Sequence, residues 1–211
     1  MERFILAYSQ QKDWDLALNE CLEQIGEIPK DSSLGFIYFT DKHATHSGDI
    51  LRKLKETTQI DDWVGTIGMA ICCTAKEFYD QPAIVLLITD LAKDHYRIFH
   101  NPGKLPNIET NEGVRVAIVH GDPRNAQLAN IIHELPDKIG NGFLAGGLTS
   151  SETFHYQIAN ELDEGALSGV IFDDAIQIAT GLTQGCSPIG KTHTITECDS
   201  NIAMQIDGRP A

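Results

Sequence analysis

Residues that could do chemistry concentrate in the stretch Gly181–Gly190, which reads Gly-Leu-Thr-Gln-Gly-Cys-Ser-Pro-Ile-Gly. Its glycines and proline predict a shaped loop, because glycine adopts backbone conformations that other residues avoid and proline fixes φ. Such a loop would display Gln184 and Cys186. The thiol would be a nucleophile if a base lay near it, with His193 or His155 as candidates. A purely structural loop that closes a sheet has the same composition, so both interpretations stay open.

A second candidate binding element is the pair Gly146-Gly147, followed by the hydroxyl residues Thr149, Ser150 and Ser151. Backbone N–H groups and hydroxyls in this order could surround a ligand carboxylate. An ordinary turn from a strand into a loop is the competing interpretation. The pair is not part of a G-x-G-x-x-G dinucleotide fingerprint.

Neither disulfides nor a structural zinc site is predicted from the cysteines. They are odd in number, widely spaced and without a C-x-x-C pair. The five positions are Cys21, Cys72, Cys73, Cys186 and Cys198. We expect most of these thiols to behave as small buried hydrophobic groups.

The histidines allow metal or haem ligation without selecting a ligand. His43 and His46 lie three residues apart near a helix start, a spacing that permits ligation from one face but is also typical of a solvated helix start. His120 lies at a strand end, where α/β folds often place ligand-binding groups. Any single histidine could serve as a haem ligand. We assign no metal ligand and no catalytic residue.

Charge and hydropathy narrow the class of protein. The 211 residues carry a formal net charge of −14, which argues against nucleic acid and anionic membranes as partners. No apolar run approaches the roughly 18 residues that span a bilayer. The N-terminus lacks the basic and apolar regions of a signal peptide, so we expect a cytoplasmic protein.

Strand-like and helix-periodic segments alternate early in each half of the chain, whereas strand pairs dominate late. This order predicts an α/β fold in which mixed parallel and antiparallel sheets are covered by helices. The predicted helices cover Trp14–Ile25, Ala44–Thr57 and Pro123–Leu135, the last with Asp122 as N-cap. The predicted strands are Phe4–Tyr8, Leu34–Thr40, Ala83–Leu91 with Tyr96–His100 beside it, Arg115–His120, Gly142–Leu148, a hairpin of Ala166–Phe172 and Ala175–Thr180, and a second hairpin of Thr192–Cys198 and Asn201–Ile206.

The predicted order of elements starts again after residues 101–113, a segment rich in turn formers that we interpret as a linker or long loop. Residues 1–100 and 114–211 would then be two similar halves. Any two α/β segments could align this loosely, so a duplication and a chance likeness both remain open.

Several strings resemble the N-terminal module of FIST domain proteins. They are Ala145-Gly146-Gly147-Leu148-Thr149, Gly169-Val170-Ile171-Phe172, Gln184-Gly185-Cys186-Ser187-Pro188-Ile189-Gly190 and Asp207-Gly208-Arg209-Pro210-Ala211. The resemblance extends over nearly all of residues 1–211. It implies a cytoplasmic sensory domain in signal transduction that binds a small molecule such as an amino acid, and haem binding with nitric oxide sensing in some relatives. It also implies a signalling partner, or a C-terminal FIST module that in the family begins at the Asp-Gly-x-Pro-Ala motif, where this chain stops.

We therefore predict a ligand-binding sensory domain rather than an enzyme. The predicted ligand-binding residues are Gly146, Gly147, Thr149, Ser150, Gln184, Gly185, Cys186 and Gly190. The alternatives are a thiol-dependent hydrolase or transferase that uses Cys186, and a haem-binding nitric oxide sensor. No cofactor is assigned.

Overall fold

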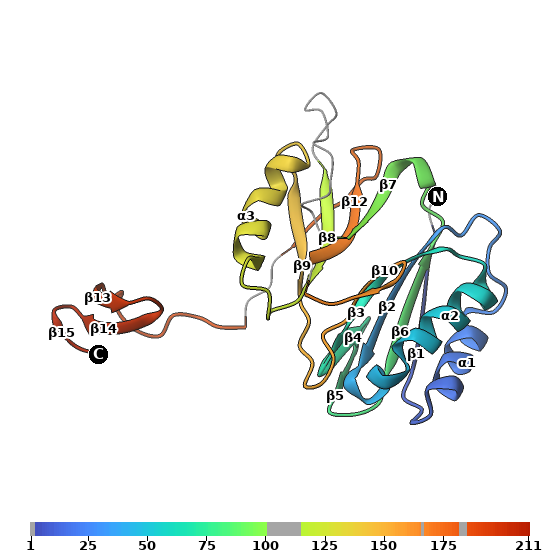
Figure 1. Ribbon diagram of the computed structural model, residues 1–211, viewed down its shortest axis with the longest axis horizontal. Helices are drawn as coiled ribbons and strands as arrows, with labels where there is room; N and C mark the ends of the chain where they lie inside the picture. The colour runs from blue at the N-terminus through green and yellow to red at the C-terminus, as the bar shows by residue number, and fades with distance from the viewer. Residues whose placement is uncertain (1–2, 101–114, 166, 182–184) are drawn as a thin grey trace. The chain divides into compact units, whose positions relative to one another are not determined.

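A computed structural model of the chain describes residues 3–100, 115–165, 167–181 and 185–211. The chain divides into two compact units, Met1–Ile178 and Ala179–Ala211 (Figure 1). Each unit is described by itself below.

The first sheet of the larger unit has the strand order β1-β6-β2-β3-β10-β11. Its strands are β1 (Phe4–Ser9), β2 (Leu34–Thr40), β3 (Asp62–Gly68), β6 (Ile84–Thr89), β10 (Gln157–Ala159) and β11 (Leu162–Asp163). β2 is central, parallel to β3 and antiparallel to β6. Nearly all of its residues are buried, which confirms the central strand that its continuous apolar sequence predicts.

Two helices cover one face of this sheet, α1 (Trp14–Ile25) and α2 (Ser47–Thr58). The carboxylate of Asp13 caps α1 by accepting hydrogen bonds from the N–H groups of Asp15 and Leu16, and Gly26 ends the helix. A short 3-10 helix, η1 (Asp41–His46), leads into α2, so the predicted α-helix starts three residues too early. The apolar faces of both helices pack on Ile37, Phe39 and their neighbours.

The second sheet has the order β7-β12-β8-β9. Its strands are β7 (Tyr96–His100), β12 (Leu167–Phe172), β8 (Val116–Gly121) and β9 (Phe143–Leu148). The helix α3 (Leu128–Lys138) connects β8 to β9, and Leu128, Leu135 and Ile139 pack on this sheet. Figure 1 shows α3 beside β9 and β8.

The two sheets repeat one topology. In the first sheet, β6 lies between β1 and β2 and is antiparallel to both, and α2 connects β2 to the parallel strand β3. In the second sheet, β12 lies between β7 and β8 and is antiparallel to both, and α3 connects β8 to the parallel strand β9. A two-stranded hairpin also follows the third strand in each case, β4–β5 (Ala70–Cys73 and Lys76–Tyr79) after β3 and β10–β11 after β9. The mixed α/β fold is confirmed, whereas a duplication with halves at residues 1–100 and 114–211 stays a prediction.

Three predicted features are wrong. Tyr96–His100 pairs with β12 in the second sheet and not with the strand that precedes it, because η2 (Lys93–His95) carries the chain across. Residues 175–180 form no strand, and β12 pairs instead with β7 and β8 on its two sides. Asp122 does not cap α3, which begins at Leu128, because its carboxylate binds Arg124 and Gly165.

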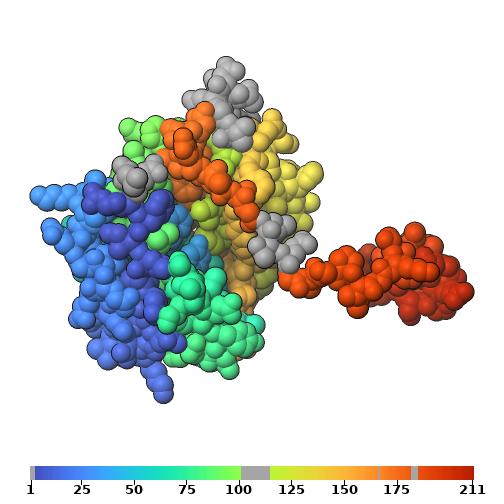
Figure 2. Space-filling model, turned by 180° about the vertical axis from the view of Figure 1, so that it is seen from behind, coloured from blue at the N-terminus to red at the C-terminus, as the bar shows by residue number. Residues whose placement is uncertain are grey.

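The β4–β5 hairpin lies at the surface near the N-terminal strand, as the blue-green and dark blue atoms in Figure 2 show. Its Phe78 packs against Leu6 and Tyr8 of β1. The smaller unit is a three-stranded antiparallel sheet of β13 (Ile195–Asp199), β14 (Ile202–Ile206) and β15 (Arg209–Pro210), which confirms the second predicted hairpin. The predicted linker 101–113 lies outside the described residues. In the described part of the chain, no helix is long and apolar enough to cross a membrane.

Candidate functional site

The two sheets of the larger unit pack against each other through an apolar layer. Phe36 and Val64 of the first sheet share this layer with Val170 and Phe172 of the second. Residues two positions apart on a strand point to the same side of the sheet. Two positions from Phe36, Val64 and Val170, the residues on this side are the polar Tyr38, Thr66 and Ser168. We call the polar residues Tyr38, Thr66, His120, Thr149, Gln157 and Ser168 the interlayer cluster.

Strand register places most of this cluster in two facing rows. In the first sheet, Tyr38 is the direct partner of Thr66, which is the partner of Gln157. In the second sheet, His120 is the direct partner of Ser168. Direct partners on adjacent strands project from the same face, so each row presents its polar groups together.

A hydrogen bond joins the rows. The hydroxyl of Tyr38 lies 3.0 Å from Nε2 of His120, and the two rings meet edge to face. Burial lowers the pKa of His120 to about 4, because the charged imidazolium would lose its hydration. Burial, with a smaller contribution from Cys72, raises the pKa of Tyr38 to about 12. Both groups are therefore neutral at physiological pH.

Thr149 forms the second polar link. Its hydroxyl lies 2.7 Å from that of Thr66 and accepts a hydrogen bond of 2.8 Å from the side-chain amide of Gln157. The same amide donates to the carbonyl of His155, so Nε2 of Gln157 is bonded twice. The end of β9 is thereby tied to β3 and β10.

Three buried atoms of the cluster have no hydrogen-bond partner: Nδ1 of His120, Oε1 of Gln157 and Oγ of Ser168. The residues are 3%, 0% and 0% exposed, respectively. An unsatisfied buried polar group costs about 1–3 kcal/mol, so three in one cluster are costly unless something binds them. The cluster is therefore the strongest candidate for a ligand site in the described part of the chain.

The three atoms differ in hydrogen-bonding character. Oε1 of Gln157 can only accept, and the Ser168 hydroxyl can donate or accept. When Nε2 of His120 accepts from Tyr38, the neutral ring carries its proton on Nδ1, which then donates. The cluster thus combines two donors and an acceptor without a net charge.

The first half of the sequence-predicted site lies along β9 and its end. Thr149 belongs to the interlayer cluster, whereas Gly147 is the direct strand partner of His120. A Cβ added to Gly147 would meet nothing within 4 Å, so there is open space beside His120. The N–H of Thr149 donates to Gly121, and Ser150 accepts a backbone bond from Met69, so these groups are already engaged.

Gly146 and Gly147 also line a cavity of about 290 Å³ near α3. Its other lining residues are apolar: Val119, Ile132, Leu144, Ala145, Leu148 and Leu167. It lacks the polar groups that the interlayer cluster supplies, and the cluster is therefore the better ligand site.

The second half of the predicted site lies in the smaller unit. Gln184 is outside the described residues, whereas Gly185, Cys186 and Gly190 are exposed on a segment that precedes β13. In this unit His193 bonds Asp207 at 2.6 Å, which lowers the pKa of that carboxyl group. That Gln184, Gly185, Cys186 and Gly190 bind a ligand stays a prediction.

The letters of residues 185–192 also fit the P-loop pattern G-x-x-x-x-G-K-[ST]. A phosphate-binding P-loop links a strand to a helix whose N-terminal N–H groups face the phosphate. Here the segment leads into β13, and all described residues around it are exposed. The structural context of a P-loop is thus missing.

The histidine pair near η1 does not form a metal site. His43 is buried, which lowers its pKa, whereas His46 stacks on Trp14. Among the described residues, no group of three or more histidine, cysteine or acidic side chains could hold a metal ion.

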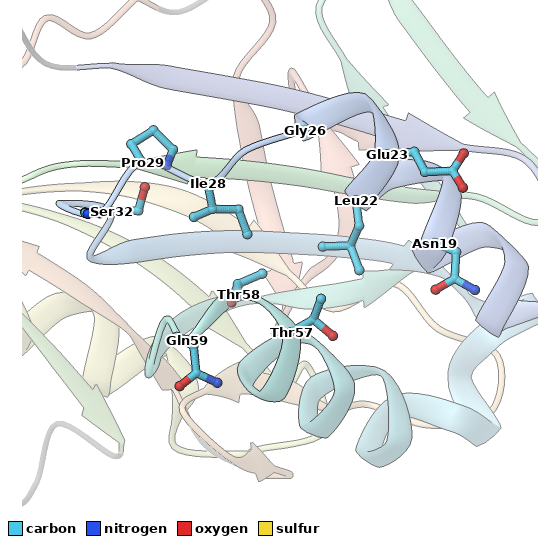
Figure 3. A pocket seen from close by; sticks show the side chains of 11 residues that line it. Asn19, Leu22, Glu23, Gly26, Ile28, Pro29, Ser32, Thr57, Thr58 and Gln59 are labelled. Carbon is cyan, nitrogen blue, oxygen red and sulfur yellow. The ribbon is translucent and has the colours of Figure 1, made fainter.

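A larger cavity of about 790 Å³ lies between the C-terminal ends of α1 and α2 (Figure 3). Leu22 and Ile28 point into it, with Asn19, Thr57 and Gln59 at its sides (Figure 3). It is open to solvent, and its described polar side chains include no buried atom without a partner. It is the weaker candidate for that reason.

Sequence reasoning singled out Thr149 and His120 but missed Tyr38, Thr66, Gln157 and Ser168. One signal was available, since Tyr38 and Ser168 are polar groups inside the otherwise apolar runs Leu34–Thr40 and Leu167–Phe172. The pairing of the two sheets, which brings these residues together, leaves no such signal.

The topology and the cluster define a mixed α/β domain of two like sheets with a polar centre between them. The FIST N domain family model matches residues 33–209, so the chain belongs to this family. FIST domains are sensory domains of signal transduction, which confirms the predicted class of protein. The type of ligand stays a prediction.

Two curated relatives are similar to the chain. They are the uncharacterized protein Mb0898c of Mycobacterium bovis and the uncharacterized protein MT0897 of Mycobacterium tuberculosis. Each is 26% identical over 200 residues, covering 89% of this chain and 50% of the relative. The chain thus spans about half the length of these relatives.

Proposed function

We propose that this domain senses a small metabolite of the amino-acid class by binding it at the interlayer cluster. The three buried, unpartnered atoms of His120, Gln157 and Ser168 carry the proposal. Gly146, Gly147 and Ser150 would form the mouth of the site beside Thr149. That Gln184, Gly185, Cys186 and Gly190 also bind the ligand stays a prediction from the sequence.

The chemistry of the cluster matches a zwitterion. Nδ1 of His120 and the Ser168 hydroxyl would donate to the ligand carboxylate, and Oε1 of Gln157 would accept from its ammonium group. A ligand with no net charge suits a neutral cluster, because burying an unpaired charge is far more costly than burying a dipole.

Binding would alter the packing of the two sheets, since the cluster joins them. A ligand that favours one arrangement of the sheets changes the surface that a signalling protein meets. The proposed partners are such a protein or a further FIST module, in the cytoplasm, without a role for nucleic acid or membrane.

The test is a thermal-unfolding screen of the protein against free amino acids, related small metabolites and hemin. A ligand at 100 times its dissociation constant stabilises the fold by about 2.7 kcal/mol, which raises Tm by several degrees. We expect a dose-dependent shift with amino acids, confirmed by calorimetric titration. The shift should vanish in Gln157→Leu and persist in the control Gln10→Leu, a change at an exposed position.

Other results would overturn the proposal. A shift with hemin alone favours the haem sensor, and turnover lost in Cys186→Ser favours the thiol enzyme. Binding of an amino acid that survives Gln157→Leu and Ser168→Ala places the ligand elsewhere.

A further inference from the structure

Ser168 lies between two histidines on the second sheet. On β12 it is the direct partner of His100 of β7 and of His120 of β8. The three side chains project from one face, because direct partners on adjacent strands do so. This face packs on the first sheet, since Val170, two positions along β12, belongs to the apolar layer. His100 therefore extends the row of His120 and Ser168 by one strand.

The three residues of this row each have a polar side-chain atom without a partner. Nδ1 of His100 is buried and makes no hydrogen bond, and the same holds for Nδ1 of His120 and Oγ of Ser168. All three residues belong to the larger unit. Because every unsatisfied buried polar atom destabilises the fold, a row of three indicates that a bound molecule is expected there.

The two histidines of the row differ in hydrogen-bonding character. Nε2 of His120 accepts from Tyr38, so Nδ1 of this ring carries the proton and donates. Nε2 of His100 lies 3.8 Å from Oε1 of Glu161, and the carboxylate favours a proton on that nitrogen. In the neutral ring, Nδ1 of His100 is then an acceptor. The row therefore accepts at the His100 end and donates at the His120 end.

Gln157 adds a second acceptor from the first sheet. Its Oε1 is buried without a partner and can only accept. The strand that carries it, β10, contacts β12 and β7, which carry Ser168 and His100. These contacts bring the acceptor of Gln157 toward the accepting end of the row.

We propose that His100 is a further ligand-binding residue and that the row sets the direction of the bound amino acid, an inference that rests on the proposed function. The ligand carboxylate accepts from Nδ1 of His120 and from Ser168. The ligand ammonium donates to Nδ1 of His100 and to Oε1 of Gln157. An ammonium group has three N–H donors, so a single acceptor would leave most of them unpaired. The ligand class is thereby narrowed to amino acids with a free amino group.

N-acetylation of the ligand tests this assignment. Thermal unfolding and calorimetric titration would compare each common free L-amino acid with its N-acetyl derivative. The acetyl group removes the positive charge and two of the three N–H donors. For every amino acid that stabilises the wild-type protein, we expect the derivative to bind more weakly by about tenfold or more.

Substitutions of His100 separate its role as an acceptor from its role in packing. His100→Leu removes the acceptor and should raise the dissociation constant by about tenfold or more. His100→Asn is the conservative variant, because Oδ1 of asparagine stands where Nδ1 stood and also accepts, so binding should stay within about threefold of wild type. His133→Leu, the same change at an exposed position on α3, should have no effect.

The tautomers can be measured without any ligand. Nitrogen NMR of isotope-labelled histidines distinguishes a protonated ring nitrogen from an unprotonated one. We expect the proton on Nδ1 in His120 and on Nε2 in His100. The same tautomer in both rings would overturn the opposite characters of the two ends.

Failure of this assignment can be told apart from failure of the proposed function. If no free amino acid stabilises the wild-type protein, both are wrong. If an amino acid binds and Gln157→Leu abolishes the binding, but His100→Leu binds it as tightly as wild type, the site stands and His100 is not part of it. N-acetyl derivatives that bind as tightly as free amino acids, or equal losses in His100→Leu and His100→Asn, would also overturn the role of His100 as an acceptor.

Discussion

Tyr38 and His120, whose side chains meet at 3.0 Å between the two sheets, occupy equivalent positions in the repeated topology. The parallel pairing of β2 with β3 begins at Leu34, and that of β8 with β9 begins at Val116. Tyr38 is the fifth residue counted from Leu34, and His120 is the fifth counted from Val116. The central hydrogen bond therefore joins the same point of both repeats. The interlayer cluster therefore lies where equivalent strands of the two sheets meet.

Removing the Tyr38 hydroxyl should destabilise the protein, because Nε2 of His120 would stay buried without a partner. We expect Tyr38→Phe to lower the free energy of unfolding by about 1–3 kcal/mol in urea denaturation. In His120→Leu the same change should cost less, since the two residues form a pair whose loss is shared. Additive effects of the two substitutions would contradict a direct bond.

The stability of the protein should fall as the pH drops from about 6.5 to about 4. His120 is neutral when buried and has its pKa lowered to about 4, whereas in the unfolded chain it binds a proton near pH 6.5. Above pH 6.5 the ring is neutral in both the folded and the unfolded chain. Between pH 6.5 and 4 only the unfolded chain binds the proton, which lowers the free energy of unfolding by up to about 3 kcal/mol.

Urea unfolding at a series of pH values measures this effect. His43 also has a lowered pKa and adds to the same window. His120→Leu should flatten the curve between pH 6.5 and 4, and His46→Leu, at a half-exposed position, should not. A wild-type curve that is level in this range would show that His120 is not buried as a neutral group.

Asp122 should stabilise the loop before α3 at any pH above about 4. Its hydrogen bonds to Arg124, and to the N–H of Gly165, lower its pKa to about 2. Since the unfolded carboxyl group has a higher pKa, this contribution is present above about pH 4 and is lost as the pH falls to about 2. Asp122→Asn should reduce the free energy of unfolding at pH 7 by about 2 kcal/mol and have little effect near pH 2. An equal loss at both pH values would contradict the charge-based explanation.

Local patterns predicted much of the fold. The apolar run Leu34–Thr40 is too continuous for an exposed strand, and helical spacing from Trp14 with Gly26 at the end defined α1. Failures occurred where long-range pairing decides the outcome. Ile176 and Ile178 alternate as in a strand, but both sides of β12 are already paired by β7 and β8. Asp122 has the residue type of an N-cap, yet Arg124 competes for its carboxylate.

The candidate site was less predictable than the fold. Thr149 was identified from its position after two glycines, but Tyr38 and His120 are 82 residues apart and no spacing rule connects them. The polar centre arises from two sheets that meet face to face, and each contributes residues that look like isolated exceptions in apolar strands. The sequence shows that these strands contain polar residues, but it does not show that the polar residues of the two sheets lie next to each other.

Two adjacent glycines in β9 should respond oppositely to alanine. Gly146 has φ +148°, and an added Cβ would lie 1.9 Å from the carbonyl oxygen of Val119, whereas a Cβ on Gly147 meets nothing within 4 Å. Gly146→Ala must move the backbone away from β8 and should lower the free energy of unfolding by about 3 kcal/mol or more.

Gly147→Ala is the matched control at the next position. It removes a flexible glycine from a strand without a clash, so its effect should lie within about 1 kcal/mol of wild type and can be stabilising. Urea denaturation of both variants measures the difference. If the two substitutions had equal effects, β9 would not lie against β8 in the register that places Gly146 beside Val119 and Gly147 beside His120.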